Sequence, residues 1–270
     1  MVLITLVDEN MNHIQRLFDL TGKTAVITGG SRGLGLQIAE CLGDLGARLV
    51  LSARKADELE AARTHLATRG VEAEWIAADG ARESDIGRLA DQALSRLGHV
   101  DILVNNAGAT WGAPAEAYPL DAWDKVMNLN VRGLFLLTQH FGRKSMIPRR
   151  YGRIINIASI AGLSGNAPGT MQTIAYNTSK GAVVNFTRAL AGEWGVYNIT
   201  VNALAPGFFP SKMTQGSLDR LGVESMCTGV PLQRLGDHED LKGAAALFAS
   251  DAGKHITGQI LAVDGGISAV

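Results

Sequence analysis

Short apolar runs alternate with longer stretches of helical periodicity from Lys23 to the end of the chain. The apolar runs cover residues 25–28, 48–51, 75–78, 102–104, 154–157, 199–203 and 260–263, and the helical patterns cover 34–46, 55–69, 83–97, 121–146 and 175–195. Strands this apolar are buried on both faces, as in a parallel sheet. The alternation predicts an α/β, doubly wound (Rossmann) fold with a parallel sheet of about seven strands flanked by helices.

The length of 270 residues suits one large domain. No internal repeat, low-complexity tract or linker divides the chain. We expect residues 1–20 to form an N-terminal tail and residues 21–270 to form a single domain. The least regular part, 205–236, holds three of the seven prolines, and a loop of that length in a compact domain is usually functional or mobile.

Composition argues against several classes of protein. The net charge of −1 implies no basic surface for nucleic acid. No apolar run approaches the ~20 residues of a membrane span, and the apolar start at residues 1–7 is too short for a signal peptide. Cys41 and Cys227 have neither metal-like nor redox-like spacing. We therefore expect a cytoplasmic protein without a metal site, and neither nucleic acid nor a membrane as a partner.

A glycine-rich turn follows the first apolar run, where residues 28–35 read TGGSRGLG. Glycines in such a turn let the backbone bend tightly and approach a pyrophosphate, and the start of the next helix offers free N–H groups to phosphate. Three spaced glycines also occur in turns without a ligand, but their position between a strand and a helix favours a dinucleotide site. The cofactor contacts predicted here are Gly29, Ser31, Arg32, Gly33, Leu34 and Gly35.

The end of the second predicted strand indicates which dinucleotide is bound. An acidic residue there would bind the ribose hydroxyls of NAD, whereas a basic residue favours the 2′-phosphate of NADP. This sequence has Ala53 at that position, followed by Arg54 and Lys55. Arg32 can converge on the same phosphate through bidentate hydrogen bonds. Arg54 and Lys55 could otherwise be surface charges that open a helix, but we predict NADP(H) as the cofactor.

Tyr176 and Lys180 are four residues apart in a predicted helix, so their side chains share one face. A phenol with a pKa of ~10 transfers protons poorly near neutral pH, and a nearby ammonium group lowers that pKa. Alone, such a pair is usually an ordinary surface pair. Polar motifs at other strand ends change this interpretation: NNAG at 105–108, Ser159, and Pro206-Gly207. In a parallel sheet all of them lie at the edge where ligands bind.

Together with the glycine-rich turn, this set closely resembles the short-chain dehydrogenase/reductase family, with its motifs in order from Leu20 to Gly266. The stretches 109–119 and 208–214 are similar to its 3-oxoacyl-[acyl-carrier-protein] reductase-like and gluconate 5-dehydrogenase-like branch. The resemblance implies hydride transfer between nicotinamide and a ketone or secondary alcohol. It also implies a homotetramer or homodimer formed through the helices at 121–146 and 175–195.

The resemblance assigns roles to four catalytic residues. It implies that Tyr176 is the general acid/base that protonates the carbonyl oxygen, and that Ser159 holds and polarises this carbonyl. Lys180 is implied to bond the nicotinamide ribose and to lower the pKa of the tyrosine. Asn130 resembles the helix asparagine that supports a water-mediated proton relay, although a helical asparagine can also be satisfied locally.

The resemblance also implies cofactor contacts beyond the glycine-rich turn. Asp79, with Gly80, resembles the acidic residue near the adenine. Asn105 resembles the backbone-stabilising asparagine. The remaining contacts implied are Asn106, Ala107 and Gly108 at the adenosine ribose, Pro206, Gly207, Phe209 and Thr214 at the nicotinamide carboxamide, and Tyr176 and Lys180. A lengthening by Phe209-Pro210 precedes Thr214.

Two features depart from the family's usual pattern. Ser159 lies 17 residues before Tyr176, a longer gap than usual, so the loop at 163–174 is lengthened. This loop is either a neutral surface insertion or, through Met171, Gln172 or Thr173, part of the substrate pocket. The second feature is the pair Phe208 and Phe209, which with Trp111 suggests an apolar or elongated substrate, unless these aromatics belong to the core.

Three functions remain open from the sequence. The favoured one is an NADPH-dependent reductase of a 3-oxoacyl or related ketone, because a sizeable apolar group fits Trp111 and Phe208. The second is a sugar or polyol dehydrogenase of the gluconate 5-dehydrogenase type, whose substrate would want more hydrogen-bonding groups. The third is a non-enzymatic dinucleotide-binding scaffold, since fold does not determine function. The small-molecule substrate, its stereochemistry and the direction of flux are left open.

Overall fold

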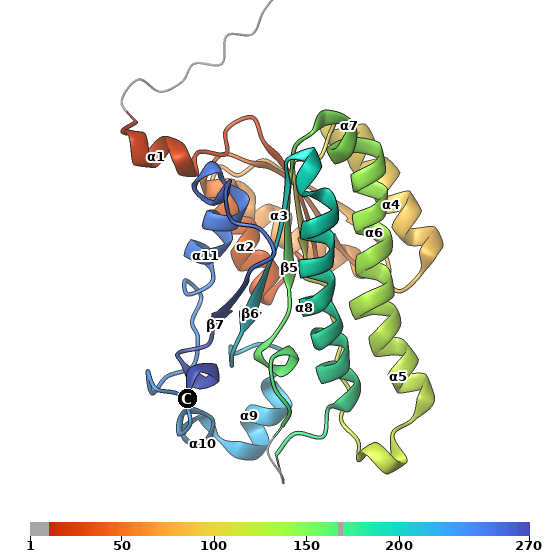
Figure 1. The fold of residues 1–270 in the computed structure, drawn as a ribbon, viewed down its shortest axis with the longest axis vertical. Helices are drawn as coiled ribbons and strands as arrows, with labels where there is room; N and C mark the ends of the chain where they lie inside the picture. Colours follow the sequence, from red (N-terminus) through yellow and green to blue (C-terminus); the bar gives the residue numbers. More distant parts are fainter. Residues whose placement is uncertain (1–10, 167–169) are drawn as a thin grey trace, which may run out of the picture.

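The computed structural model describes residues 11–166 and 170–270. Their centre is a seven-stranded sheet of order β3-β2-β1-β4-β5-β6-β7, in which every neighbouring pair is parallel (Figure 1). The strands are β1 (Thr24–Thr28), β2 (Arg48–Ala53), β3 (Ala73–Ala77), β4 (Ile102–Asn105), β5 (Gly152–Ile157), β6 (Ile199–Pro206) and β7 (Ile260–Val263). The prediction of a doubly wound parallel sheet is confirmed, and each predicted strand is present.

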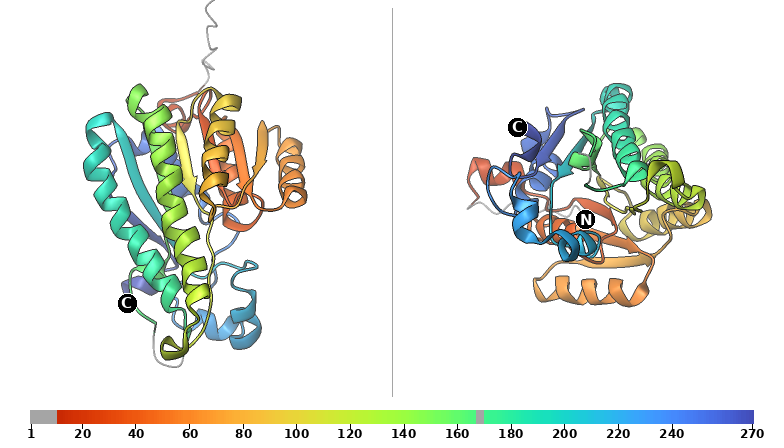
Figure 2. Two further views of the ribbon diagram at one scale, coloured as in Figure 1. Left: turned by 90° about the vertical axis from the view of Figure 1, so that its right-hand side faces the viewer. Right: turned by 90° about the horizontal axis from the view of Figure 1, so that it is seen from below.

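Helices cover both faces of the sheet and give three layers (Figures 1 and 2). One face carries α2 (Gly33–Asp44), α3 (Ala56–Thr68) and α11 (Lys242–Ala249), and the other carries α4 (Glu83–Leu97), α6 (Leu134–Phe141) and α8 (Ile174–Trp194). Val26 and Ile27 show why β1 is continuously apolar. They are fully buried neighbours that belong to the cores on opposite faces, because successive side chains of a strand alternate.

The long helix predicted at 121–146 is a continuous helical run that extends from residue 120 to residue 149. It consists of α5 (Leu120–Met127), a π-helical segment η2 (Asn128–Gly133), α6, a second π-helical segment η3 (Gly142–Met146), and α7 (Ile147–Arg149). π-Helical turns inside helices often mark functional sites. Asn130, a predicted catalytic residue, lies in the first of them.

The stretch 205–236 is more regular than predicted. Its first two residues complete β6, and it contains the helices α9 (Gln215–Leu221) and α10 (Val223–Cys227). These helices were missed because both are short and lie among prolines and glycines. They lie below the carboxyl ends of the strands in Figure 1.

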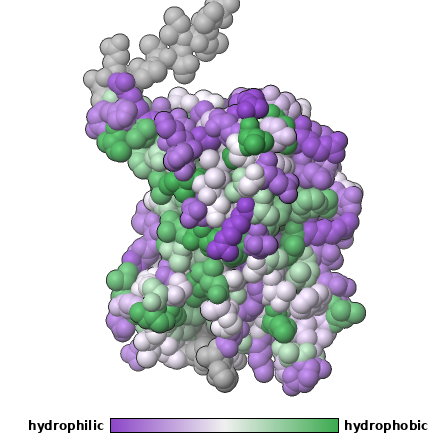
Figure 3. Space-filling model, viewed as in Figure 1, coloured by the Kyte–Doolittle hydropathy of each residue, from purple (hydrophilic) through white to green (hydrophobic). Residues whose placement is uncertain are grey.

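Outside the sheet, the amphipathic piece expected near the N-terminus is α1 (His13–Phe18), capped by Asn12 and Gln15, whereas residues 1–10 lie outside the described part of the chain. Single-turn helices complete the fold: η1 (Ala115–Ala117), η4 (Ile160–Gly162), η5 (Gly195–Tyr197), η6 (Asp251–Gly253) and η7 (Ile267–Ala269). Polar and apolar residues are interspersed on the face seen in Figure 3. Within residues 11–166 and 170–270, no helix has the length and apolar character needed to cross a membrane.

Candidate active site

The chain order of the strands reverses between β1 and β4, which are neighbours in the sheet. In doubly wound folds, ligands bind outside the carboxyl ends of the strands at such a switch point. The glycine-rich turn follows β1 here, and the segment 106–108 follows β4. Ser159 comes two residues after the end of β5. The parallel register therefore brings the predicted motifs to one edge of the sheet.

The glycine-rich turn is packed too tightly for side chains at two of its glycines. Gly29 has a φ of +64°, and a Cβ added there would lie 2.7 Å from Nδ2 of Asn106. A Cβ on Gly35 would collide with the carbonyl oxygen of Gly29. Asn106 donates from Nδ2 to the carbonyl oxygens of Thr28 (2.9 Å) and Gly29 (3.1 Å), so the end of β4 holds the turn in place.

Asn105 bonds to side chains of two neighbouring elements. Its Nδ2 donates to Oγ1 of Thr138 (3.0 Å) and to Oδ1 of Asn156 (2.9 Å), which joins β4 to α6 and β5. All three side chains are buried. Asn106, the next residue, bonds instead to main-chain groups of the glycine-rich turn.

Tyr176 and Lys180 both lie in the first two turns of α8. Nζ of Lys180 donates a 2.6 Å hydrogen bond to the carbonyl oxygen of Ile157, at the end of β5, and lies 5.6 Å from the centre of the Tyr176 ring. Burial lowers the pKa of Lys180 to about 8. The lysine is therefore held beside the tyrosine with a pKa close to the neutral range.

Burial raises the pKa of Tyr176, and a hydrogen bond with Ser159 opposes this rise only in part. The net direction is opposite to the lowering by Lys180 that was expected from the sequence. The cost of placing a phenolate in a poorly solvated site outweighs the other effects in this structure. The tyrosine is consequently protonated at neutral pH.

Ser159 is positioned by the turn that follows β5. It is 9% exposed and caps η4, accepting a hydrogen bond from the main-chain N–H of Ala161 at 3.1 Å. Its hydroxyl also meets the phenol of Tyr176. Ser159, Tyr176 and Lys180, which come from two segments of the chain, thus form one cluster.

Asn130 joins three separate segments. Its Oδ1 accepts from the N–H of Ala109 (2.8 Å), and its Nδ2 donates to the carbonyl oxygen of Ala109 (2.9 Å) and to Oγ of Ser179 (2.9 Å). These partners are 21 and 49 residues away, so the side chain is not satisfied within its own helix. A Cβ on Gly108 would lie 3.4 Å from Oδ1 of Asn130 and 3.7 Å from Nζ of Lys180, which places Asn130 close to the Tyr176–Lys180 cluster.

The residues predicted to select the cofactor surround the ends of β2 and β3. Arg54 and Asp79 line a pocket of about 270 Å³ together with Ala77, Ala78, Arg82 and Asp85. Oδ1 of Asp79 accepts a 3.0 Å hydrogen bond from the N–H of Ala81, and Gly80 packs against Gly133 of η2. Arg32 and Lys55 are both paired with Glu58, a residue that the sequence did not single out.

The segment expected at the nicotinamide follows β6. A Cβ on Gly207 would lie 2.8 Å from Cα of Asp264, which explains the glycine. Oγ1 of Thr214 donates to the carbonyl oxygen of Phe209 at 2.7 Å and closes a local turn. Phe209 is 4% exposed and packs in the core. Of the two possibilities given for these aromatics, the side chain of Phe209 therefore agrees with a place in the core. Phe208 is half-buried.

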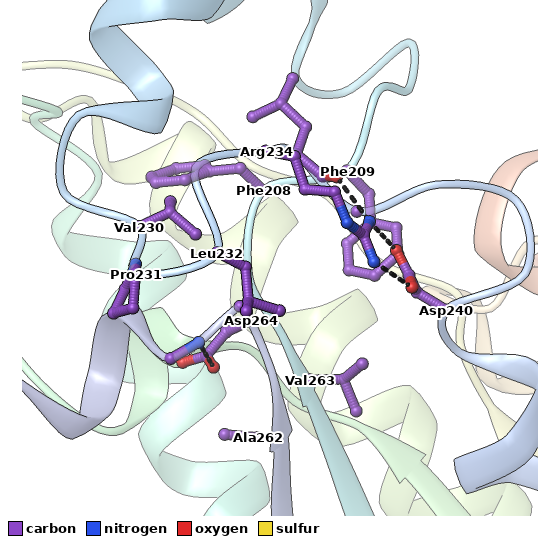
Figure 4. A pocket seen from close by; sticks show the side chains of 14 residues that line it. Phe208, Phe209, Val230, Pro231, Leu232, Arg234, Asp240, Ala262, Val263 and Asp264 are labelled. Carbon is purple, nitrogen blue, oxygen red and sulfur yellow. Dashed lines mark hydrogen bonds and ion pairs between the residues drawn. The ribbon is translucent and has the colours of Figure 1, made fainter.

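A pocket of about 550 Å³ is lined in part by this segment and was not predicted (Figure 4). Phe208, Val230, Pro231 and Leu232 form much of its apolar wall, and the ion pair of Arg234 with Asp240 lies at one side. Neither Tyr176 nor Ser159 lines it. Its lining comes from segments far apart in the chain, so local sequence patterns contain no signal for it.

The lengthened loop is described except at residues 167–169. Nδ2 of Asn166 donates to the carbonyl oxygen of Met171 (2.6 Å) and to Oγ1 of Thr173 (3.1 Å), and Oγ1 of Thr173 donates to Oδ1 of Asn177 (2.9 Å). The carbonyl oxygen of Gln172 accepts from the N–H of Ala113 at 2.9 Å. The loop is thus joined both to the helix of Tyr176 and to the segment that follows β4.

Comparisons with known proteins agree with this geometry. A family model for short chain dehydrogenase matches residues 23–221. The rhamnolipids biosynthesis 3-oxoacyl-[acyl-carrier-protein] reductase of Pseudomonas aeruginosa is 41% identical over 254 residues, which cover 92% of this chain and 97% of that protein. The gluconate 5-dehydrogenase of Gluconobacter oxydans is 38% identical over 257 residues, which cover 93% of this chain and 97% of that protein.

A solved structure gives the same result. Gluconate 5-dehydrogenase from Burkholderia cenocepacia, in complex with NADP and tartrate, is 34% identical and superposes with a TM-score of 0.90 over 96% of this chain and 100% of that one. The family resemblance inferred from the motifs is confirmed. The chain belongs to the short-chain dehydrogenase family.

Proposed function

We propose that this protein is an NADP(H)-dependent oxidoreductase that reduces a ketone carrying a sizeable apolar group, of the 3-oxoacyl type. The observation that carries the proposal is the cluster of Ser159, Tyr176 and Lys180 at the sheet edge that also holds the glycine-rich turn. Relatives named as 3-oxoacyl-[acyl-carrier-protein] reductases support the substrate class.

The residues present fit a dinucleotide with a 2′-phosphate. Gly29 and Gly33 have positive φ and line a turn at the start of α2, whose N–H groups suit a pyrophosphate. Ala53 ends β2 where an acid would favour NAD, and Arg32, Arg54 and Lys55 stand nearby. When bound, the reduced cofactor supplies the hydride.

The side chains supply proton transfer and orientation. We infer that the hydroxyl of Ser159 donates to the substrate carbonyl oxygen while Tyr176, protonated at neutral pH, transfers its proton to the same atom. The ammonium of Lys180 then stabilises the phenolate, since it is held nearby by Ile157. Asn130 fixes the main chain at Ala109 and thereby the wall next to this lysine.

Exposed apolar side chains favour a substrate with an apolar group. Trp111, Leu163, Ile174 and Met213 are each at least 40% exposed. They belong to the segments that follow β4, β5 and β6 or that open α8, which surround the catalytic edge. The hydroxyl groups of a sugar would need hydrogen-bonding side chains at the positions that these apolar residues occupy.

A sugar or polyol dehydrogenase is the second candidate. The side chains of Asn166, Thr173 and Asn177 form a polar network next to Tyr176, and one relative named gluconate 5-dehydrogenase is 38% identical to this chain. Polar side chains of this kind suit hydroxylated substrates.

The experiment that separates the candidates is a comparison of NADPH oxidation with acetoacetyl thioesters and with 5-ketogluconate. We expect the thioesters to give the higher kcat/KM. A higher value with the keto-sugar would favour the second candidate, and the absence of turnover of either substrate by the wild-type protein would contradict both.

We also propose a homotetramer or homodimer. Phe135 of α6 is 44% exposed and contacts Phe186 of α8 edge to face, with ring centres 6.3 Å apart. An aromatic pair of one exposed and one half-buried ring on neighbouring helices suits burial against a second copy. Light scattering on Phe135→Ser and on wild type tests this, since an unchanged mass would contradict an interface there.

A further inference from the structure

Glu58 lies among the cations predicted to bind the 2′-phosphate. It is in the first turn of α3, and its carboxylate oxygens accept hydrogen bonds of 2.7 and 2.8 Å from Nη1 of Arg32. Nζ of Lys55 lies 3.1 Å from Oε1 of Glu58. Arg32 belongs to the glycine-rich turn and Lys55 precedes α3, so one carboxylate bridges the two segments.

This bridge stands at the carboxyl end of β2. The N–H of Gly29 donates to the carbonyl oxygen of Ser52 at 2.7 Å, and a Cβ on Gly30 would lie 3.0 Å from the side chain of Leu51. The glycine-rich turn therefore lies against the last residues of β2. In doubly wound folds the ribose of the dinucleotide is recognised just beyond this strand. An internal anion is thus paired with the cations expected to meet the 2′-phosphate.

The charges around Glu58 keep it ionised. The hydrogen bond from Lys55, followed by the charges of Arg32, Lys55 and Lys212, holds the pKa of Glu58 below its usual value. Lys212 comes from the segment between β6 and α9, so cations from three parts of the chain act on one carboxylate. Arg54, by contrast, has no ion pair within the described residues and lines the neighbouring pocket.

We propose that Glu58 is a specificity-determining residue that weakens the preference for NADP(H), because it competes with the 2′-phosphate for Arg32 and Lys55. The inference rests on the proposed NADP(H) site. A phosphate monoester carries a charge of about −1.5 to −2 and can replace a carboxylate on a guanidinium. Binding NADP(H) then requires breaking the existing pair, whereas NAD(H) leaves it intact. Glu58 thereby narrows the difference in affinity between the two cofactors.

The test uses binding of small probes, which does not depend on turnover. Adenosine 2′,5′-bisphosphate and 5′-AMP differ by the 2′-phosphate alone, and their dissociation constants can be measured by calorimetry on the full chain. We expect Glu58→Gln to bind the bisphosphate about five-fold more tightly than wild type does, the gain for releasing one partly exposed ion pair. Binding of 5′-AMP should not change.

Asp57→Asn is the matched control, since Asp57 is an exposed acid in the same turn and has no ion pair within the described part of the chain. It removes the same charge but leaves Arg32 and Lys55 paired, so bisphosphate affinity should change far less. In an Arg32→Ala background, Glu58→Gln should lose most of its effect.

Two results would overturn the inference, and they can be told apart. In the first, the wild-type protein binds the bisphosphate more tightly than 5′-AMP, and Glu58→Gln leaves this difference in affinity equal or smaller. Glu58 would then orient the cations and not compete with the phosphate, while the proposed NADP(H) site would be retained. If neither wild type nor Glu58→Gln distinguishes the two probes, there is no 2′-phosphate site and the proposed cofactor preference fails as well.

Discussion

Gly162 lies directly against the main chain of Lys180, since a Cβ added to Gly162 would be 2.5 Å from the carbonyl carbon of Lys180. Gly162 ends η4, the turn that Ser159 caps. This close approach sets the distance between the serine of one segment and the Tyr176–Lys180 helix. Catalytic geometry therefore depends on a glycine that is not among the predicted catalytic or cofactor-binding residues.

Replacing this glycine should separate the two halves of the catalytic cluster. We expect Gly162→Ala to lower kcat by about 100-fold, because displacement of catalytic groups by ~1 Å is costly. Gly165→Ala is the control, since an added Cβ there meets no atom of residues 11–166 and 170–270 within 4 Å. Wild-type kcat in Gly162→Ala would show that η4 can shift without loss.

Tyr176→Phe should reduce turnover by about 10²- to 10⁴-fold, the usual contribution of a general acid. The phenyl ring keeps the apolar packing, so the dissociation constant for adenosine 2′,5′-bisphosphate should remain within about two-fold of the wild-type value, a difference of about 0.4 kcal/mol. Steady-state kinetics and calorimetry check the two parts separately. Substantial turnover by Tyr176→Phe would contradict the proposed role of Tyr176 as the general acid.

Ketone reduction should depend on the protonation of Lys180. The pKa of Lys180 is lowered to about 8, so its ammonium is present below that pH and lost above it. We expect kcat for reduction to fall as pH rises through about 8, because the neutral amine no longer stabilises the phenolate left after proton transfer. Alcohol oxidation should instead increase at alkaline pH, since the raised pKa of Tyr176 keeps the phenol protonated near neutrality.

The control for this pH profile is Lys180→Arg, which keeps its charge over the accessible pH range. The falling limb near pH 8 should disappear in this variant, whatever its absolute rate. A limb that stays in place would mean that another group titrates there.

Asn130→Ala should lower both stability and turnover. The substitution leaves the N–H and carbonyl of Ala109 without their present partner, and also removes the bond to Ser179. A loss of about 2 kcal/mol in the free energy of unfolding is expected from buried groups left unpaired. Urea unfolding of Asn130→Ala and of Asn128→Ala, a half-buried neighbour in the same π-helical segment, measures the difference.

Glu40 should make folding sensitive to acid. Its side chain is 2% exposed and contacts His65 of α3, His238, and Lys242 of α11. Burial would raise the pKa of Glu40, but hydrogen bonds from Lys242, His65 and His238 outweigh it and lower the pKa from 4.5 to about 2. Because the folded-state pKa lies below the unfolded one, this stabilisation is complete above pH 4.5 and is lost as pH falls towards 2.

Glu40→Gln should therefore lower the free energy of unfolding by about 3 kcal/mol at pH 7 and by much less at pH 3, as expected when one partner of a buried ionic cluster is removed. Glu239→Gln removes an exposed partner of the same Lys242 and should cost under about 1 kcal/mol. Equal losses in the two variants at pH 7 would contradict the role of burial.

The seven strands, the glycine-rich turn and the Tyr176–Lys180 pair could be predicted because each is encoded locally. A short apolar run such as β5 predicts a buried strand regardless of which elements pack against it. A four-residue spacing in a helix places two side chains on one face. The order of motifs then identified the family, since parallel strands bring their carboxyl ends to one edge.

Tertiary packing decided what depends on partners distant in sequence. Phe208 and Phe209 are identical neighbours in the sequence, yet one is half-buried and the other belongs to the core. The direction of the pKa of Tyr176 follows from burial by other segments, and it reversed the prediction made from Lys180 alone. Glu58 of α3 contacts Arg32 of the glycine-rich turn, 26 residues away in sequence, because the folded sheet brings these two segments together. Periodicity and spacing describe a residue's own segment, whereas solvation and ion pairing depend on which other segments surround it.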